Sequence, residues 1–144
     1  MYGSEMSDLE EALTLRSGDE GSTAFADPRY ESINAMFGGW TTAIALRATL
    51  EAAENAALPS AITVNFVDRV EPGAKVHTRS RLVGSSRSVE HWLTELLSAD
   101  GRTLALATVV LSNRRDTDGH TQPSMPEAPD PETLDEFHPP GPQG

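Results

Sequence analysis

The first periodic segment of the chain is a long helical pattern over Asn34–Leu58. Its first part is small or apolar almost all round, whereas Arg47 and Glu51 stand four residues apart in its second part, the spacing of one solvent-exposed helix face. Because proline disfavours helical geometry in the residue before it, we expect Pro59 to end the helix at Leu58. The pattern predicts one long, largely buried helix.

After this helix the hydrophobic period changes to two, which is typical of strands. Four strands are predicted, over Ile62–Val67, Lys75–Leu82, Val89–Leu97 and Thr103–Asn113. The last two flank Asp100–Gly101, a dipeptide typical of antiparallel hairpin turns. Ala12–Arg16 and Ser22–Phe25 are short enough to be additional strands upstream. This order predicts an α+β fold, with an antiparallel meander curved around one helix.

The charges lie mainly at the two ends of the chain. The net charge of the 144 residues is −11, but residues 21–115 carry nine acids and ten bases, so this middle part is nearly neutral. Residues 116–144 hold seven acids, no Lys or Arg and seven of the ten prolines, a composition that buries too little apolar surface to fold. We expect a flexible acidic N-terminus over 1–9, a folded domain over 10–115 and a flexible tail over 116–144.

The composition also excludes several classes of protein. The chain has no cysteine, and no pair of its four histidines has the spacing of metal ligands, so we expect no metal site. No apolar run is long enough to span a membrane, and the acidic N-terminus is unlike a signal peptide, which predicts a cytoplasmic protein. Acidic ends, and the lack of a basic stripe with interleaved aromatics, argue against nucleic acid as a partner.

Four segments resemble the hotdog-fold thioesterases, in particular the N-terminal hotdog half of acyl-CoA thioesterase II (TesB-like) proteins. They are Asn34-Ala-Met-Phe-Gly-Gly-Trp40, Ile62-Thr-Val-Asn-Phe-Val-Asp-Arg69, Glu71-Pro-Gly73 and Gly84-Ser-Ser-Arg-Ser-Val89. The resemblance covers roughly residues 10–113. It implies a single hotdog fold that hydrolyses acyl-CoA esters, with no metal and no cofactor except the coenzyme A of the substrate. It also implies a site at the N-terminus of the central helix, where two hotdogs meet.

The start of the predicted helix fits this chemistry. A thioester carbonyl becomes an oxyanion when water adds, and free N–H groups of Gly38, Gly39 and Trp40 could donate hydrogen bonds to that oxyanion. The two glycines would let the acyl group approach, or would simply permit close packing of the helix on a strand. Phe37 and Trp40 are candidates for the wall of the acyl pocket, with ordinary core positions as the alternative.

The group that activates water is harder to assign. Hotdog enzymes place a carboxylate before the glycines or about two turns along the helix, where this chain has Ala45-Leu-Arg47. Asn34 could position water, with the role of helix N-cap as the alternative. Asp27 and Glu31 precede the helix and are further candidates, or partners of its dipole.

The remaining site candidates come from the strands. In TesB-like proteins the water-activating carboxylate, Ser/Thr and Gln belong to the C-terminal hotdog, and Gly39, Thr63 and Ala99 correspond to them here, so that only Thr63 keeps its type. Asn65 shares a strand face with Thr63 and could line the pocket. Arg87, with Arg79 and Arg81, could meet the phosphates of coenzyme A, although a row of Arg is more often a solvated face. His91 is interpreted as a core residue, and His77 as exposed.

Two functions follow from this resemblance. The first is a thioesterase acting on acyl-CoA or an acyl-carrier thioester at the interface of a homodimer or a dimer of dimers. The second is a catalytically silent hotdog that binds acyl groups or partners a separate catalytic hotdog. Hydration of enoyl thioesters is disfavoured because the chain lacks the Asp-to-His spacing of those hotdogs.

Overall fold

A computed structural model describes residues 7–19, 21–53, 57–113, 116, 118–119 and 122–136 of the chain. The chain divides into two compact units, Met1–Arg114 and Arg115–Gly144. The first unit contains α1 (Asp8–Ala12), β1 (Leu15–Gly18), β2 (Gly21–Phe25), η1 (Pro28–Tyr30), α2 (Gly38–Ala53), β3 (Leu58–Phe66), β4 (Lys75–Ser85), β5 (Val89–Leu97) and β6 (Thr103–Ser112). In the described part of the second unit, the one element is the 3₁₀ turn η2 (Pro131–Thr133).

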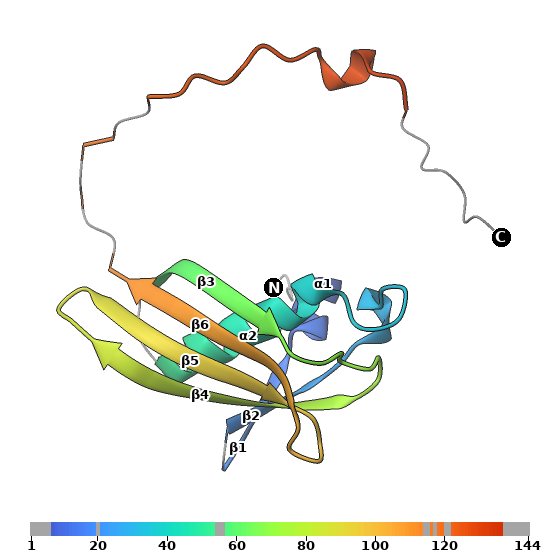
Figure 1. Cartoon of the computed structure of the whole chain (residues 1–144), viewed down its shortest axis with the longest axis vertical. Coiled ribbons are helices and arrows are strands. Elements are labelled where there is room, and N and C mark those ends of the chain that lie inside the picture. Colours follow the sequence, from blue (N-terminus) through green and yellow to red (C-terminus); the bar gives the residue numbers. More distant parts are fainter. Residues whose placement is uncertain are drawn as a thin grey trace, which may run out of the picture. The chain divides into compact units, whose positions relative to one another are not determined.

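The six strands form one antiparallel sheet in the order β1-β2-β4-β5-β6-β3 (Figure 1). β4, β5 and β6 follow one another as the predicted meander, and Gly101, with a φ of 83°, makes the predicted turn between the last two. The prediction of a four-strand meander is wrong for β3. This strand does not lie next to β4 but pairs with β6 at the far edge of the sheet. The α+β class, with a sheet around one long helix, is confirmed.

The helix α2 packs on one face of this sheet (Figure 1). Ile44 and Ala45 of α2 and Val76, Leu96 and Leu111 of the strands have no exposed surface. Because strand side chains alternate between faces, these residues fix which side of each strand points toward α2. The side chains of the opposite set form what we call the outer face. In the described residues, every helix is too short or too polar to cross a membrane.

The helix is shorter than the sequence pattern predicted at both ends. It begins at Gly38 instead of Asn34, and Leu58 already belongs to β3. The residues before Gly38 are held in a loop, because Glu31 and Met36 form an isolated β-bridge and the Met36 N–H donates to the carbonyl of Val70 at 2.9 Å. Local tertiary hydrogen bonds therefore override the helical pattern ahead of the glycines.

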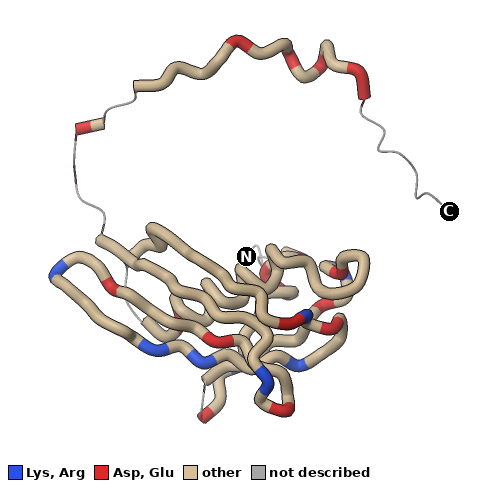
Figure 2. Tube along the Cα trace, in the orientation of Figure 1, with Lys and Arg blue, Asp and Glu red and all other residues tan. Residues whose placement is uncertain are grey.

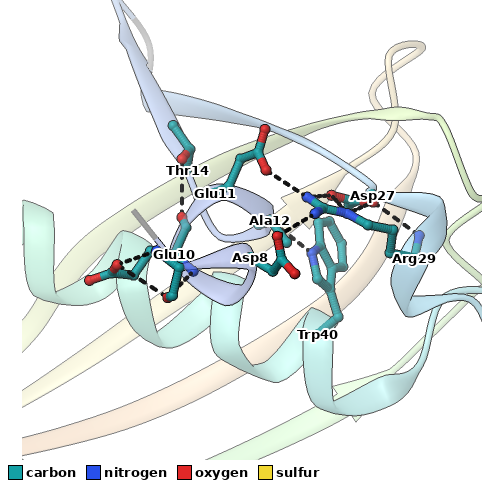
Figure 3. Close-up of polar contacts among 9 residues, drawn as sticks. Asp8, Glu10, Glu11, Ala12, Thr14, Asp27, Arg29 and Trp40 are labelled. Carbon is teal, nitrogen blue, oxygen red and sulfur yellow. Dashed lines mark hydrogen bonds and ion pairs between the residues drawn. The ribbon is translucent and has the colours of Figure 1, made fainter. Parts of the chain in front are cut away.

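The short helix α1 was not anticipated from the sequence, and it is fixed to the first turn of α2. Ala12, expected to begin a strand, ends α1 instead, and its carbonyl accepts a 2.9 Å hydrogen bond from Nε1 of the buried Trp40 (Figure 3). Beside it, Arg29 of η1 forms ion pairs with Asp8 and Glu11 of α1 and with Asp27. These contacts attach the segment leading into β1 to the helix that carries the candidate site.

Candidate active site at the start of helix α2

The first backbone N–H groups of α2 differ in whether they are already used. The N–H of Trp40 donates to the carbonyl of Phe37 at 2.9 Å, and that of Thr41 donates to the same carbonyl at 3.4 Å. Within the described residues, the N–H groups of Gly38 and Gly39 have no acceptor. Two of the three predicted donors, Gly38 and Gly39, are therefore free to bind an oxyanion, and the positive end of the helix dipole lies there as well.

A cavity of about 230 Å³ adjoins this helix start. Gly38 and Thr41 of α2 line one side of it. The other side comes from the loop residues before α2 and from the end of β3, where Phe66, Val67 and Asp68 contribute. This cavity lies beside the unused N–H of Gly38, and it is large enough for a reacting carbonyl group.

Two phenylalanines explain why the helix begins with glycines. A Cβ atom on Gly38 would lie 3.2 Å from the Phe66 ring, and one on Gly39 would lie 2.3 Å from the Phe37 ring. Phe37 and Phe66 are each 59% exposed, and Val67, which lines the same cavity as Phe66, is exposed too. The glycines thus permit close packing of two aromatic side chains, and these side chains form an apolar surface around the free N–H groups.

Asp68 is a carboxylate in this cavity that the sequence analysis did not single out. It follows the end of β3, its N–H donates to the carbonyl of Leu104, and it forms an ion pair with Arg102. One carboxylate oxygen also accepts the N–H of Arg69 at 2.8 Å. A carboxylate has about four acceptor positions, so Asp68 can still accept a hydrogen bond from water. In the sequence, the one feature that pointed to Asp68 was its position in the Ile62–Arg69 segment that resembles the thioesterases.

The other predicted residues near the helix have different surroundings. Trp40 is only 2% exposed and lies in the core, not in the lining of the cavity. Asn34 is exposed in the loop, and its alternative role as N-cap is wrong because α2 begins four residues later. Glu31 is also exposed.

The carboxylate of Asp27 is already engaged by Arg29. Its carboxylate accepts hydrogen bonds from the side chain and the N–H of Arg29, which lower its pKa, while Asp27 together with Glu11 raises the pKa of Arg29. Asp27 also caps η1. Its role in the structure is therefore to connect η1 and α1.

Thr63 and Asn65 share a strand face, as expected, but that face is the outer one. Thr63 pairs with Thr108 and Asn65 with Leu106, whereas the α2 side of β3 carries Val64, paired with the buried Ala107. Both Thr63 and Asn65 are exposed. The structure does not bring them together with Gly38 and Gly39 within one chain.

Arg87 lies at the other end of the domain from the cavity. It is exposed in the turn between β4 and β5, and the next residue, Ser88, accepts a hydrogen bond from Asn113 beside the Leu58 end of β3. The cavity is at the Phe66 end of the same strand. His91 is exposed on the outer face, so its interpretation as a core residue is wrong, and His77 is half-buried.

Among the described residues, no group of three His, Asp or Glu side chains is arranged to hold a metal ion. The arrangement that the structure does present is two free backbone donors, an exposed apolar surface and one carboxylate. Such a set can polarise a carbonyl and position water.

Known structures share this fold. A hot dog protein of unknown function from Alicyclobacillus acidocaldarius is 28% identical with a TM-score of 0.80, over 93% of this chain and 50% of its own. The tesB protein of Mycobacterium avium subsp. paratuberculosis is 22% identical with a TM-score of 0.73, over 90% of this chain and 50% of its own. The BH2602 protein of Bacillus halodurans, crystallised with CoA, is 15% identical with a TM-score of 0.60. The match covers 68% of this chain and 70% of the BH2602 chain.

The chain spans about half the length of the first two of these proteins. No curated protein sequence gives a significant match. Residues 26–112, more than half of the chain, match the family described as the acyl-CoA thioesterase N-terminal domain. These residues begin directly after β2, run to the end of β6 and include the whole of the site described above. The chain is therefore a hotdog-fold protein that belongs to the acyl-CoA thioesterase N-terminal domain family.

Proposed function

We propose that the protein hydrolyses acyl thioesters, with acyl-CoA as the substrate class, at the start of α2. The observation that carries this proposal is the pair of unused N–H groups on Gly38 and Gly39 beside a cavity. When water adds to the thioester carbonyl, negative charge develops on its oxygen, and preorganised donors stabilise that charge most strongly in the transition state. The exposed rings of Phe37 and Phe66 form the adjoining apolar wall for the acyl chain.

The second half of the site comes from a second hotdog, supplied by another copy of the chain. β3 is an edge strand with no Lys, Arg, Asp or Glu, and Phe66 and Leu58 are exposed at its two ends. Antiparallel pairing of two β3 edges would place the Leu58 end of one copy beside the Phe66 end of the other. Arg87, remote from the cavity in its own chain, would then approach the cavity of the second copy, where the phosphates of coenzyme A need a cation.

Asp68 is the group best placed to orient the attacking water. It lies in the same cavity as Gly38, whereas Thr63 and Asn65 are on the outer face and Asp27 is engaged by Arg29. The ion pair with Arg102 keeps the Asp68 carboxylate in one place. Thr63 and Asn34 remain candidates only if the second hotdog brings them to a cavity.

A specific observation favours the alternative of a silent hotdog. The helix positions two turns after the glycines are Ala45, Leu46 and Arg47, so α2 itself carries no carboxylate toward the carbonyl. In that case the same surface binds an acyl group, or partners a separate catalytic hotdog, without turnover. The BH2602 protein shows that a structure of this fold has been crystallised with CoA.

Hydrolysis of a panel of acyl-CoA esters of different chain length tests the two functions. The thioesterase proposal expects release of free coenzyme A, and Asp68→Asn should then lower kcat while KM stays near the wild-type value. Asp100→Asn is the matched control, because Asp100 lies in the β5–β6 turn with Ser98 as its partner. Binding of acyl-CoA without turnover at any chain length would favour the silent hotdog, and absence of both binding and turnover would contradict the thioesterase proposal and acyl binding by a silent hotdog alike.

A further inference from the structure

The outer face of the sheet carries a row of basic side chains along β4. Successive outward positions are Lys75, His77, Arg79 and Arg81, because the residues between them, such as Val76 and Thr78, are buried toward α2. Figure 2 shows Lys and Arg positions along β4. At a rise of about 3.4 Å per residue, the row from Lys75 to Arg81 is about 20 Å long.

The cations of this row have no ionic partner in the described part of the domain. Lys75, Arg79 and Arg81 are exposed, and none of them forms an ion pair there, whereas Arg29, Arg47, Arg69 and Arg102 all do. Glu95, directly opposite Arg79 on β5, is the one carboxylate among the cross-strand neighbours of the row, and it is half-buried. The row therefore presents excess positive charge to solvent in a chain whose net charge is −11.

Apolar side chains lie on both sides of the basic row. Leu97 is paired with His77, and Leu93 with Arg81, and both leucines are half-buried on the outer face. On the other side, Phe25 of β2 is paired with Lys75 and is 60% exposed. A cavity of about 370 Å³ opens beside this part of the face, and His77, Arg79 and Leu97 line it together with Asp19 from the turn after β1.

We propose that this face docks an acidic protein segment that also carries apolar side chains. A row about 20 Å long is too extended for a single phosphate or carboxylate, and it matches the length of a helix or strand with repeated acidic residues. The leucines and Phe25 would contact the apolar side chains of that segment, and its acidic side chains would meet Lys75, Arg79 and Arg81. A nucleic-acid backbone is charged at every phosphate and offers no apolar side chains to Leu93 and Leu97, so a protein segment fits this face better.

This docking surface is separate from the cavity at the start of α2, so the proposal does not depend on thioester hydrolysis. The charged contacts are exposed, and we therefore expect association to be fast and strongly weakened by salt. The apolar contacts should leave a residual interaction at high salt.

Fluorescence anisotropy of a labelled peptide tests the proposal on the full chain. The probe is a synthetic peptide in which Glu and Leu recur with helical spacing, and the control peptide has Gln in place of every Glu. We expect the acidic peptide to bind at low salt, and the control peptide to bind at least about tenfold more weakly. Equal binding of the two peptides, or no binding of the acidic peptide, would overturn the proposal.

Two variants locate the binding to the row. Arg79→Gln combined with Arg81→Gln should weaken binding of the acidic peptide about tenfold, whereas Arg47→Gln, on the exposed face of α2, should change it less than about twofold. Thermal unfolding checks that all three substitutions leave the domain folded. A double variant that binds like the wild type would overturn the proposal, and so would tighter binding of a single-stranded oligonucleotide than of the peptide.

Discussion

The two edges of the sheet are built in opposite ways. β1 is four residues long, includes the exposed Arg16, and follows a segment fixed to α2 through Trp40 and Ala12. β3 at the other edge is nine residues long and uncharged, with exposed apolar side chains at both ends. Proteins commonly protect a sheet edge by making it short, charged or covered, because an open edge pairs with other chains. The β1 edge is protected within the chain, whereas the described residues leave the β3 edge open.

The largest effect is expected at the helix start beside the β3 edge. In Gly39→Val the new side chain must displace the Phe37 ring and occupy the space of the oxyanion, so turnover of acyl-CoA should fall about 10²–10³-fold. Phe37 is exposed and can move, so the domain should remain folded. Steady-state hydrolysis measures the effect, with Gly84→Val as control because a Cβ atom there meets no neighbour within 4 Å. Equal rates in the two variants would place the site elsewhere.

The second effect concerns the edge itself. Phe66→Asp puts a charge on the apolar end of β3, and we expect it to weaken self-association by about 2 kcal/mol or more, roughly 30-fold in the dimer dissociation constant. Phe25→Asp is a closely matched control, because Phe25 is 60% and Phe66 59% exposed, but Phe25 lies on β2. Analytical ultracentrifugation compares the variants. A similar loss of association in both would show that β3 is not the interface.

A third effect tests the protection of the β1 edge. Trp40→Phe leaves the carbonyl of Ala12 without its donor, which should lower the free energy of unfolding by roughly 1–3 kcal/mol. Trp92→Phe removes a hydrogen bond to the carboxylate of Glu90, a less buried acceptor, and should cost less. Urea unfolding measures both. If Trp92→Phe were the more damaging substitution, the attachment of α1 to α2 would not be what holds the β1 side together.

The smallest effect is expected for the C-terminal unit. Deletion of residues 116–144 should change the free energy of unfolding by less than about 0.5 kcal/mol, because the described residues of this segment are all exposed. Among them, Met125 is 88% exposed. Thermal unfolding of the truncated and full-length chains tests this expectation. A large drop in the unfolding temperature would mean that the segment packs on folded structure.

The sequence predicted the elements of the fold better than their bounds. Alternation at Val76, Thr78 and Ser80 located β4 because one face of that strand is buried, and such burial leaves a period in the sequence. The start of α2 was misplaced because the loop before Gly38 is fixed by hydrogen bonds, one of which joins Met36 to Val70, a residue distant in sequence. Pairing between backbone groups of remote segments leaves no local pattern.

The candidate site was predictable only in part, for the same reason. Gly38 and Gly39 could be identified from their place at the start of a buried helix, and no acceptor for their N–H groups lies among the described residues. Asp68 had only its position in the Ile62–Arg69 segment as a signal, because its approach to the helix depends on β3 pairing with β6 instead of β4. The shared face of Thr63 and Asn65 was predicted by period two, but which side of the sheet that face takes depends on the position of α2.

Sedimentation velocity of the wild-type chain tests most directly whether the β3 edge forms an interface that completes the site. We expect a homodimer at micromolar concentration, because a nine-residue uncharged edge with exposed Phe66 and Leu58 leaves apolar surface and backbone hydrogen-bonding groups unpaired in a single chain. A dimer that further pairs into a tetramer would agree with this account. A stable monomer over the whole micromolar range would contradict it.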